Sequence, residues 1–211
     1  MRQLFVLAVV AALLVACDNS PVFHGMTQQQ KETYSNAIAG EYTGRNIFIY
    51  NNGTDDATAV KVEGARMTIT AQSMQVVMFH DFPISVLSNV VTDPALAEAL
   101  ATVPNQDILA TYSFFNLQDN GDVNWGYEPA AIPLKLHYGG TDHHLTLKLS
   151  NGRVYYGLMK VNMDAGNPFG GNSIFDFSID AIYDGDTLVQ DFDRVWQDND
   201  HYIITYFQKD E

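Results

Sequence analysis

The chain has 211 residues, of which 46% are hydrophobic and 17% charged, and its formal net charge is −14. This composition is that of an ordinary globular protein, so it excludes a disordered chain. The length suits one large β domain or two small ones. The acidic charge excludes a nucleic-acid-binding protein, which needs a positive face.

Residues 1–16 have the pattern of an export signal. Arg2 gives a short positive region, and the apolar run over residues 4–13 is too short for a permanent membrane span. The next residues, Leu14-Val15-Ala16-Cys17, resemble the bacterial lipobox, in which the chain is cut before the cysteine. The resemblance implies acyl chains such as palmitate on Cys17. Each buried methylene would contribute about 0.8 kcal/mol to anchoring.

Cys17 is the only cysteine of the chain, so we expect its thiol to carry lipid and no disulfide to form. Residues 17–26 are short and polar, as is typical of a lipidated tether. No long linker follows, and we predict that residues 27–211 form a single mainly β domain.

Three helical segments are predicted in this domain. The first covers Thr27–Ala39, because Thr27 and Gln30 have the spacing of a capping box. Residues 85–90 have helical composition. The third segment covers Pro94–Ala101, where Asp93 is the expected N-cap and proline occupies the first helical position.

Strand signals dominate from Glu41 onward. We expect about ten strands, mostly joined by short turns, and therefore an antiparallel β-sandwich or flattened barrel with an N-terminal helix and one or two short inserted helices. The clearest strand segments are residues 42–49, 66–70, 74–79, 108–115, 132–160, 175–183 and 201–207.

Three turn signals set the expected strand register. Gly139-Gly140, Asn151-Gly152 and Asp184-Gly185 are pairs that tolerate positive φ and favour two-residue hairpin turns. Pairing around Asn151-Gly152 would place a set of apolar residues on one face. The predicted pairs are Leu149 with Val154, Leu147 with Tyr156, and Leu145 with Leu158.

The lipobox, residues 38–44 and residues 81–84 leading into 96–100 together resemble small lipoproteins of gut Bacteroidota. These are catalogued as a domain of unknown function, family 4840. The resemblance covers most of the mature chain and implies no activity and no catalytic residues. The Gly-x-Tyr-x-Gly segment at Gly40 is also similar to the first strand of calycin, or lipocalin-like, barrels.

Histidines near the Gly139-Gly140 turn are candidate metal ligands. His143 is adjacent to His144, so the two point to opposite faces of a strand. His137 lies opposite His144 in one register and opposite Asp142 in another. Zinc needs three or four ligands, and the candidates are His137, His144 and Asp142. The alternative interpretation is a polar outer face of the sheet.

Trp125, Tyr127 and Trp196 are candidate ligand-binding residues, because exposed aromatic rings on a β scaffold can stack on ligands. Trp125 and Tyr127 precede Pro129, which predicts a loop or an edge strand. The alternative is that the tryptophans fill the ends of the core. No nucleophile, phosphate-loop or dinucleotide motif is present, so no catalytic residue and no cofactor is assigned.

The expected protein is a lipoprotein of the bacterial cell envelope, with the outer membrane favoured over the inner. It contacts the membrane through lipid on Cys17 and acts as a non-enzymatic binding or interaction module. The candidate ligands are a glycan and an envelope protein. The alternatives are a carboxylate-dependent hydrolase and a calycin-like barrel that carries an apolar small molecule.

Overall fold

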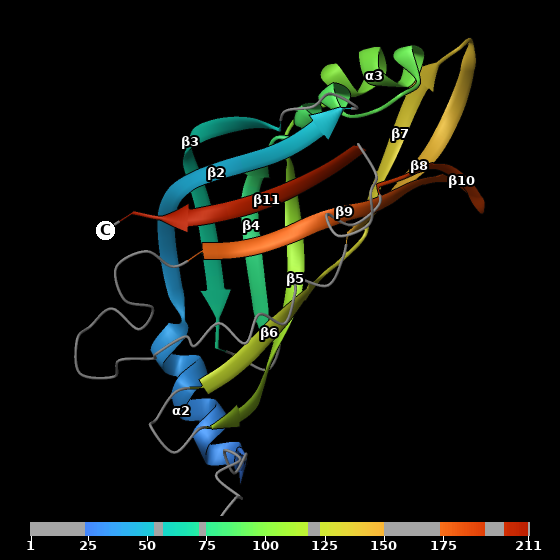
Figure 1. Ribbon diagram of the computed structural model, residues 1–211. Coiled ribbons are helices and arrows are strands. Elements are labelled where there is room, and N and C mark those ends of the chain that lie inside the picture. The colour runs from blue at the N-terminus through green and yellow to red at the C-terminus, as the bar shows by residue number, and fades with distance from the viewer. Residues whose placement is uncertain are drawn as a thin grey trace, which may run out of the picture.

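One long antiparallel sheet curls into a half-barrel (Figure 1). The computed structural model describes residues 24–52, 57–71, 75–117, 123–149, 174–192 and 201–210. Its strands are β1 (His24–Gly25), β2 (Gly40–Asn52), β3 (Thr58–Thr70), β4 (Val76–Phe82), β5 (Gln106–Leu117), β6 (Val123–Pro129), β7 (Ile132–Tyr138), β8 (Thr141–Leu149), β9 (Ile174–Asp184), β10 (Thr187–Asp191) and β11 (His201–Lys209).

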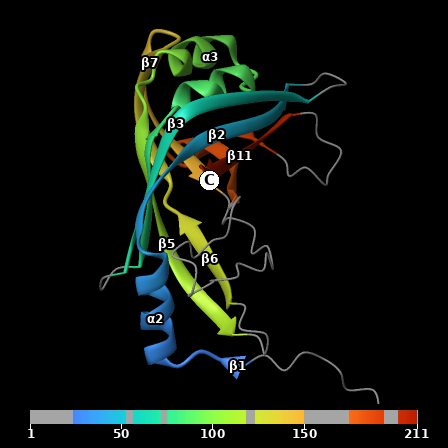
Figure 2. The same cartoon turned by 90° about the vertical axis from the view of Figure 1, so that its left-hand side faces the viewer.

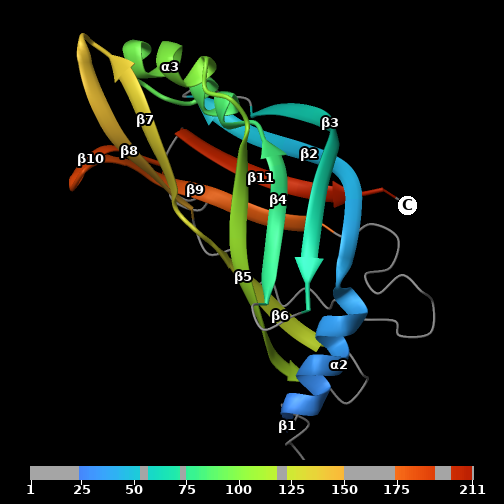
Figure 3. The same cartoon turned by 180° about the vertical axis from the view of Figure 1, so that it is seen from behind.

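The strand order is β1-β5-β4-β3-β2-β11-β9-β8-β7, with β6 beside β5 and β10 beside β9. β6 and β7 are neighbours in the sequence, separated by Ala130 and Ala131 only. β6 pairs with β5 and β7 pairs with β8, so this stretch links two distant parts of the sheet (Figure 3). The predicted mainly β antiparallel fold is confirmed, and the sheet is a half-barrel rather than two packed sheets.

The alternation of apolar and polar residues decides which face of the sheet is buried. On β3, Ala65, Met67 and Ile69 are buried, whereas Arg66 between them is exposed and Thr68 is half-buried. The inward residues of the strands join one continuous hydrophobic cluster. Its largest fully buried side chains are those of Phe48, Phe79, Phe82 and Phe207. Burying one such ring contributes about 1.5–3 kcal/mol relative to leaving it exposed.

The predicted helices are confirmed, one of them with a different geometry. α2 (Gln28–Ile38) begins with the expected capping box, in which the Thr27 hydroxyl accepts from the Gln30 N–H at 3.2 Å. η1 (Ile84–Asn89) is a 3-10 helix, and α3 (Pro94–Ala101) is capped by Asp93. Figure 2 shows α2 at one end of the half-barrel and α3 at the other.

Two of the predicted hairpin turns are present. Gly139 and Gly140 have φ values of 58° and 81° and join β7 to β8, and Gly185, with φ 56°, joins β9 to β10. Only glycine adopts such values without strain.

The third turn, Asn151-Gly152, and its predicted partners lie outside the described residues. Leu147 of β8 has Ile132 of β7 on one side and Ile182 of β9 on the other. The neighbour on β7 is the one that the Gly139-Gly140 turn predicts, whereas β9 lies on the side where we expected Tyr156. The apolar pattern gave the correct face of β8, but a pattern on one strand does not choose among several apolar neighbours.

Residues 1–23, which contain the predicted signal, Cys17 and most of the tether, lie outside the described residues. Among the residues that the structure describes, no helix is long and apolar enough to cross a membrane.

Candidate functional site

A β-bulge in β4 marks the most unusual backbone of the described residues. The pairing of β4 with β5 shifts its register between Phe79 and Phe82, which leaves His80 and Asp81 in the irregular part. Asp81 has a φ of 51° and is the only non-glycine residue with positive φ in the described ranges. Such strained backbone persists where surrounding contacts fix it, and it is common at functional sites, as bulges are.

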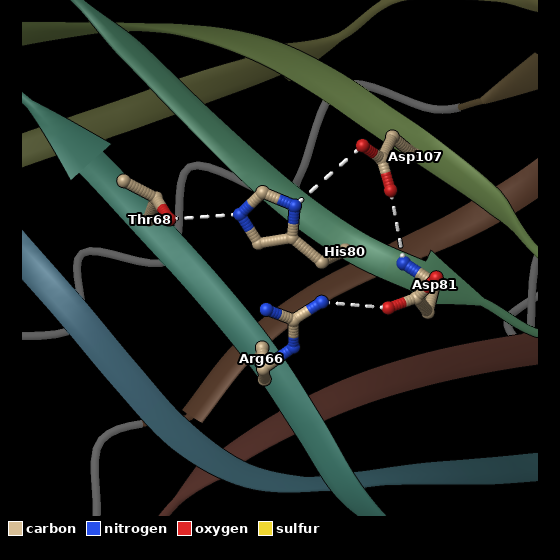
Figure 4. A network of polar contacts seen from close by, with 5 residues as sticks. All are labelled: Arg66, Thr68, His80, Asp81 and Asp107. Carbon is tan, nitrogen blue, oxygen red and sulfur yellow. Dashed lines mark hydrogen bonds and ion pairs between the residues drawn. The ribbon is translucent and has the colours of Figure 1, made fainter.

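Two side chains hold Asp81 in this conformation (Figure 4). The backbone N–H of Asp81 donates to Asp107 Oδ1 at 3.0 Å. Its carboxylate accepts a hydrogen bond from Arg66 Nη2 at 2.8 Å. The three residues come from β3, β4 and β5, so the contacts tie three neighbouring strands together.

His80 lies between a hydroxyl and a carboxylate (Figure 4). Its Nε2 is 2.8 Å from Thr68 Oγ1, and its Nδ1 is 3.5 Å from Asp107 Oδ2. The His80 side chain is 24% exposed and that of Asp107 is 55% exposed. Of these two side chains, the imidazole of His80 is therefore the less exposed to solvent.

The strand register explains why these residues meet. Arg66 of β3 is paired with His80 of β4, and Thr68 with Met78. Met78 is in turn paired with Leu109 of β5. These residues alternate with the buried ones, so they share the face of the sheet that points away from the core. We call this surface the outer β3–β5 face; it consists of Arg66, Thr68, Met78, His80, Asp107 and Leu109.

Arg66 lies among carboxylates on this side of the sheet. The hydrogen bond and the negative charge of Asp81 raise the pKa of Arg66 above its ordinary value, and Asp107 and Glu41 add to this effect. The Arg66 and Asp81 side chains are 60% and 68% exposed. An ion pair so open to water adds little to folding stability, and its main consequence is a fixed geometry.

The order of Thr68, His80 and Asp107 is that of a hydroxyl nucleophile, a base and an orienting carboxylate. A working arrangement of this kind also needs oxyanion donors and a hydrogen bond from the base to the carboxylate. The 3.5 Å contact is longer than a good hydrogen bond. Thr68 is paired with Glu41 and Met78 on its two sides, so its backbone belongs to the sheet ladder. The geometry therefore fits recognition better than nucleophilic attack.

A second polar cluster lies where β7, β8 and β9 meet. His143 Nδ1 is 2.7 Å from Asp184 Oδ2, and the His144 N–H donates to Asp184 Oδ1 at 3.1 Å. The Tyr138 ring stacks on His143 with centroids 3.8 Å apart. The hydrogen bond from His143 lowers the pKa of Asp184. Burial, followed by the charges of Asp184 and Asp93, raises the pKa of Tyr138.

A polar hollow of about 590 Å³ lies between α2 and the facing ends of β3 and β4. Ser35 and Gln75 are hydrogen-bonded at 3.0 Å beside it. Its described lining is formed by Gln28, Lys31, Glu32, Ser35, Asn36, Ala71 and Gln75.

The structure brings together two of the three predicted metal ligands. His137 Nδ1 lies 2.6 Å from Asp142 Oδ1, whereas His144 is paired with Lys135. Within the described part of the chain, no group of three or more His, Cys, Asp or Glu residues could hold a metal ion. Metal binding by His137, His144 and Asp142 stays a prediction from the sequence.

The predicted aromatic residues are only partly described. Trp125 and Tyr127 lie on β6, which pairs with β5 alone among the described strands, as an edge strand does. Tyr127 is partly buried, with its ring 6.0 Å from that of Phe79. Trp125 is paired with Phe114, and Trp196 lies outside the described residues.

Sequence reasoning did not find the outer β3–β5 face. The available signal was the segment Asp81-Phe82-Pro83, which interrupts a strand with an acidic residue before an aromatic one. Its partners Arg66 and Asp107 are 15 and 26 residues away, and only the strand pairing brings them to it.

The fold and this site define a mainly β half-barrel protein with an open polar sheet face. The family described as Domain of unknown function (DUF4840) matches residues 37–166, more than half of the chain. The chain belongs to this family, which confirms the predicted resemblance to family 4840. The match includes the whole outer β3–β5 face. None of the curated proteins and none of the solved structures matches the chain.

Proposed function

We propose that this protein is an envelope lipoprotein, anchored through lipid on Cys17, whose β domain is a non-enzymatic module that binds another envelope protein. The lipobox and the preceding apolar run support the anchor. The outer β3–β5 face supports the binding role and is the surface that contacts the partner.

The exposure of Leu109 is the observation that carries this proposal. Its side chain is 41% exposed on the outward side of β5 and is paired with the half-buried Met78. Charged Arg66 and Asp107 lie on the same face. An apolar centre with a polar rim is the usual anatomy of a protein–protein contact surface.

The polar rim, formed by Arg66 and Asp107, is held rigid through Asp81. Asp81 is held in an unfavourable backbone conformation by Arg66 and Asp107. A rim that is ordered before the partner arrives loses less conformational entropy on binding. The strain at Asp81 is therefore consistent with selection for a fixed surface rather than for stability.

A protein partner fits this face better than a glycan. Glycan sites on β scaffolds use aromatic rings as stacking platforms, and none of the six residues of the outer β3–β5 face is Trp, Tyr or Phe. Arg66 and Asp107 offer opposite charges, which favours a partner whose polar rim carries both signs.

A photo-crosslinking residue in place of Leu109 tests the proposal in intact cells of the native host. We expect one protein adduct that disappears when Arg66→Glu is added, because the charge reversal removes the rim complementarity. The matched control carries the crosslinking residue at Leu188, an exposed leucine on β10. Identical adducts from both positions, or no adduct from position 109, would contradict the proposal.

The hydrolase alternative has one observation in its favour, the 2.8 Å contact between Thr68 Oγ1 and His80 Nε2. Hydrolysis of an activated ester such as 4-nitrophenyl acetate by the lipid-free chain tests it. We expect equal rates for the wild type and for Thr68→Val. A loss of activity in both Thr68→Val and His80→Ala, with folding unchanged, would favour the enzyme over the binding module.

A further inference from the structure

We propose that the free edge of β10 binds an extended, basic peptide segment of another protein by adding it as a strand. This surface is separate from the outer β3–β5 face and lies outside the residues that match the family. The inference rests on apolar exposure, strand pairing, rigidity and charge.

β10 concentrates the exposed apolar surface of the described chain. Among the described residues, the large exposed apolar side chains are Leu109, Leu188 and Val189, and the last two are neighbours on β10. Leu188 is 49% exposed and Val189 37%. Both exposed residues lie at the bulge of β10, and their exposure shows that this part of the strand stands clear of the core.

One edge of the strand is paired with no other strand that the structure describes. Within the described residues β10 pairs with β9 only, through Leu188 with Tyr183 and Gln190 with Ile182. Val189 is the extra residue of the bulge between these pairs. An edge strand exposes a row of backbone N–H and C=O groups that an extended peptide can use, while alternate side chains contact exposed apolar residues.

Three contacts hold β10 in place before any peptide arrives. The Gln190 side chain is buried and is hydrogen-bonded to Val90 and Thr92, which follow η1. The Phe192 N–H donates to the Asp180 carbonyl at 2.8 Å, and the Phe192 ring is buried. A fixed edge needs little ordering when a strand is added, which favours binding.

The negative charge of β10 and of the turn before it favours a basic partner. Residues 185–191 contain the exposed Asp186 and Asp191 and no Lys, Arg or His. A second copy of the chain would bring two acidic edges together and would be repelled. A segment that alternates basic and apolar residues would instead satisfy both the carboxylates and Leu188 with Val189.

Fluorescence anisotropy of a labelled peptide that alternates lysine and valine, titrated with the full lipid-free chain, tests the proposal. We expect binding that weakens with added salt, because the attraction between charges is screened. The double variant Leu188→Lys with Val189→Lys should bind at least about tenfold more weakly. Leu109→Lys is the matched control and should bind as the wild type does. Thermal melting checks that each variant is folded.

A second peptide separates strand addition from charge attraction alone. The same sequence with N-methylated backbone at alternate residues keeps its charge but cannot complete a strand ladder, and we expect it not to bind. Equal binding of the two peptides would overturn the proposal, as would an equal effect of Leu109→Lys.

Light scattering supplies a further test, since self-association that disappears in the double variant would make a second copy the occupant. None of these results depends on crosslinking at position 109, so this inference and the proposed function fail separately.

Discussion

The side-chain Oε1 of Gln190 accepts two hydrogen bonds from Thr92, one from the backbone N–H at 2.9 Å and one from the hydroxyl at 3.2 Å. The Gln190 amide N–H also donates to the Val90 carbonyl at 3.0 Å. These contacts join β10 to the segment between η1 and α3, which lies about a hundred residues earlier. The buried side-chain amide of Gln190 thus fixes the position of β10 relative to residues 90–92.

Gln190→Ala should destabilise the protein by about 1–3 kcal/mol, because the buried Val90 carbonyl loses its hydrogen bond from Gln190. Urea unfolding followed by circular dichroism measures the change. Gln106→Ala is the control, because Gln106 makes one long side-chain bond of 3.3 Å to Pro104. Equal losses in both variants would show that the Gln190 network is not special.

Leu147→Ala should cost about 2–5 kcal/mol, which is the usual range for truncating a fully buried leucine. Leu147 is 0% exposed and lies between β7 and β9. His144→Ala, on the exposed face of the same strand, should cost little. Comparable losses for the two substitutions would show that the assignment of faces on β8 is wrong.

The stability of the protein should fall in acid partly because of Asp184. The hydrogen bond from His143 lowers the pKa of the folded-state carboxyl below its ordinary value of 3.8. Its stabilising contribution is therefore present above pH 3.8 and is lost as the pH falls through the lower folded-state pKa.

Calorimetry of the wild type and of Asp184→Asn across this pH range measures the effect. We expect the difference between their melting temperatures to shrink as the pH falls. Asp186→Asn controls for the loss of a charge in the same turn. A difference that stays constant with pH would contradict the assignment to Asp184.

Trp125→Ala should remove binding in a screen of glycans, peptides and envelope fractions without changing thermal stability, if Trp125 forms part of a recognition surface as the sequence predicts. Tyr127→Ala is the comparison. It should lower the melting temperature, because Tyr127 packs on Phe79. A large drop in melting temperature for Trp125→Ala would make Trp125 a core residue.

Cys17→Ser should abolish labelling by radioactive palmitate and leave the precursor uncut by the lipoprotein signal peptidase. Ser20→Ala, in the same tether, should be labelled and cut normally. Detergent fractionation of cells reports the location of both variants. Membrane attachment of Cys17→Ser that resists a salt wash would place the anchor elsewhere.

Features that depend on neighbouring residues were predictable from the sequence. The capping box of α2 involves Thr27 and Gln30, and the cap of α3 involves Asp93 and the next residues. The Gly139-Gly140 turn needs only two residues that tolerate positive φ. Alternation on β8 likewise gave the buried face correctly, because each of these patterns acts within a few residues of the chain.

The tertiary structure alone decided which strands are neighbours and therefore where the candidate sites lie. On one side Leu147 is paired with Ile182 rather than with the predicted Tyr156, because many apolar strands offer equivalent faces and the closing of the sheet chooses among them. Arg66 and Asp107 reach Asp81 for the same reason. The sequence determined the class of fold, the turns and the helix ends through local interactions. The outer β3–β5 face follows from pairings between distant strands, and β10 is held in place by the contacts of Gln190 with Val90 and Thr92. Local chemistry specifies neither of these long-range contacts.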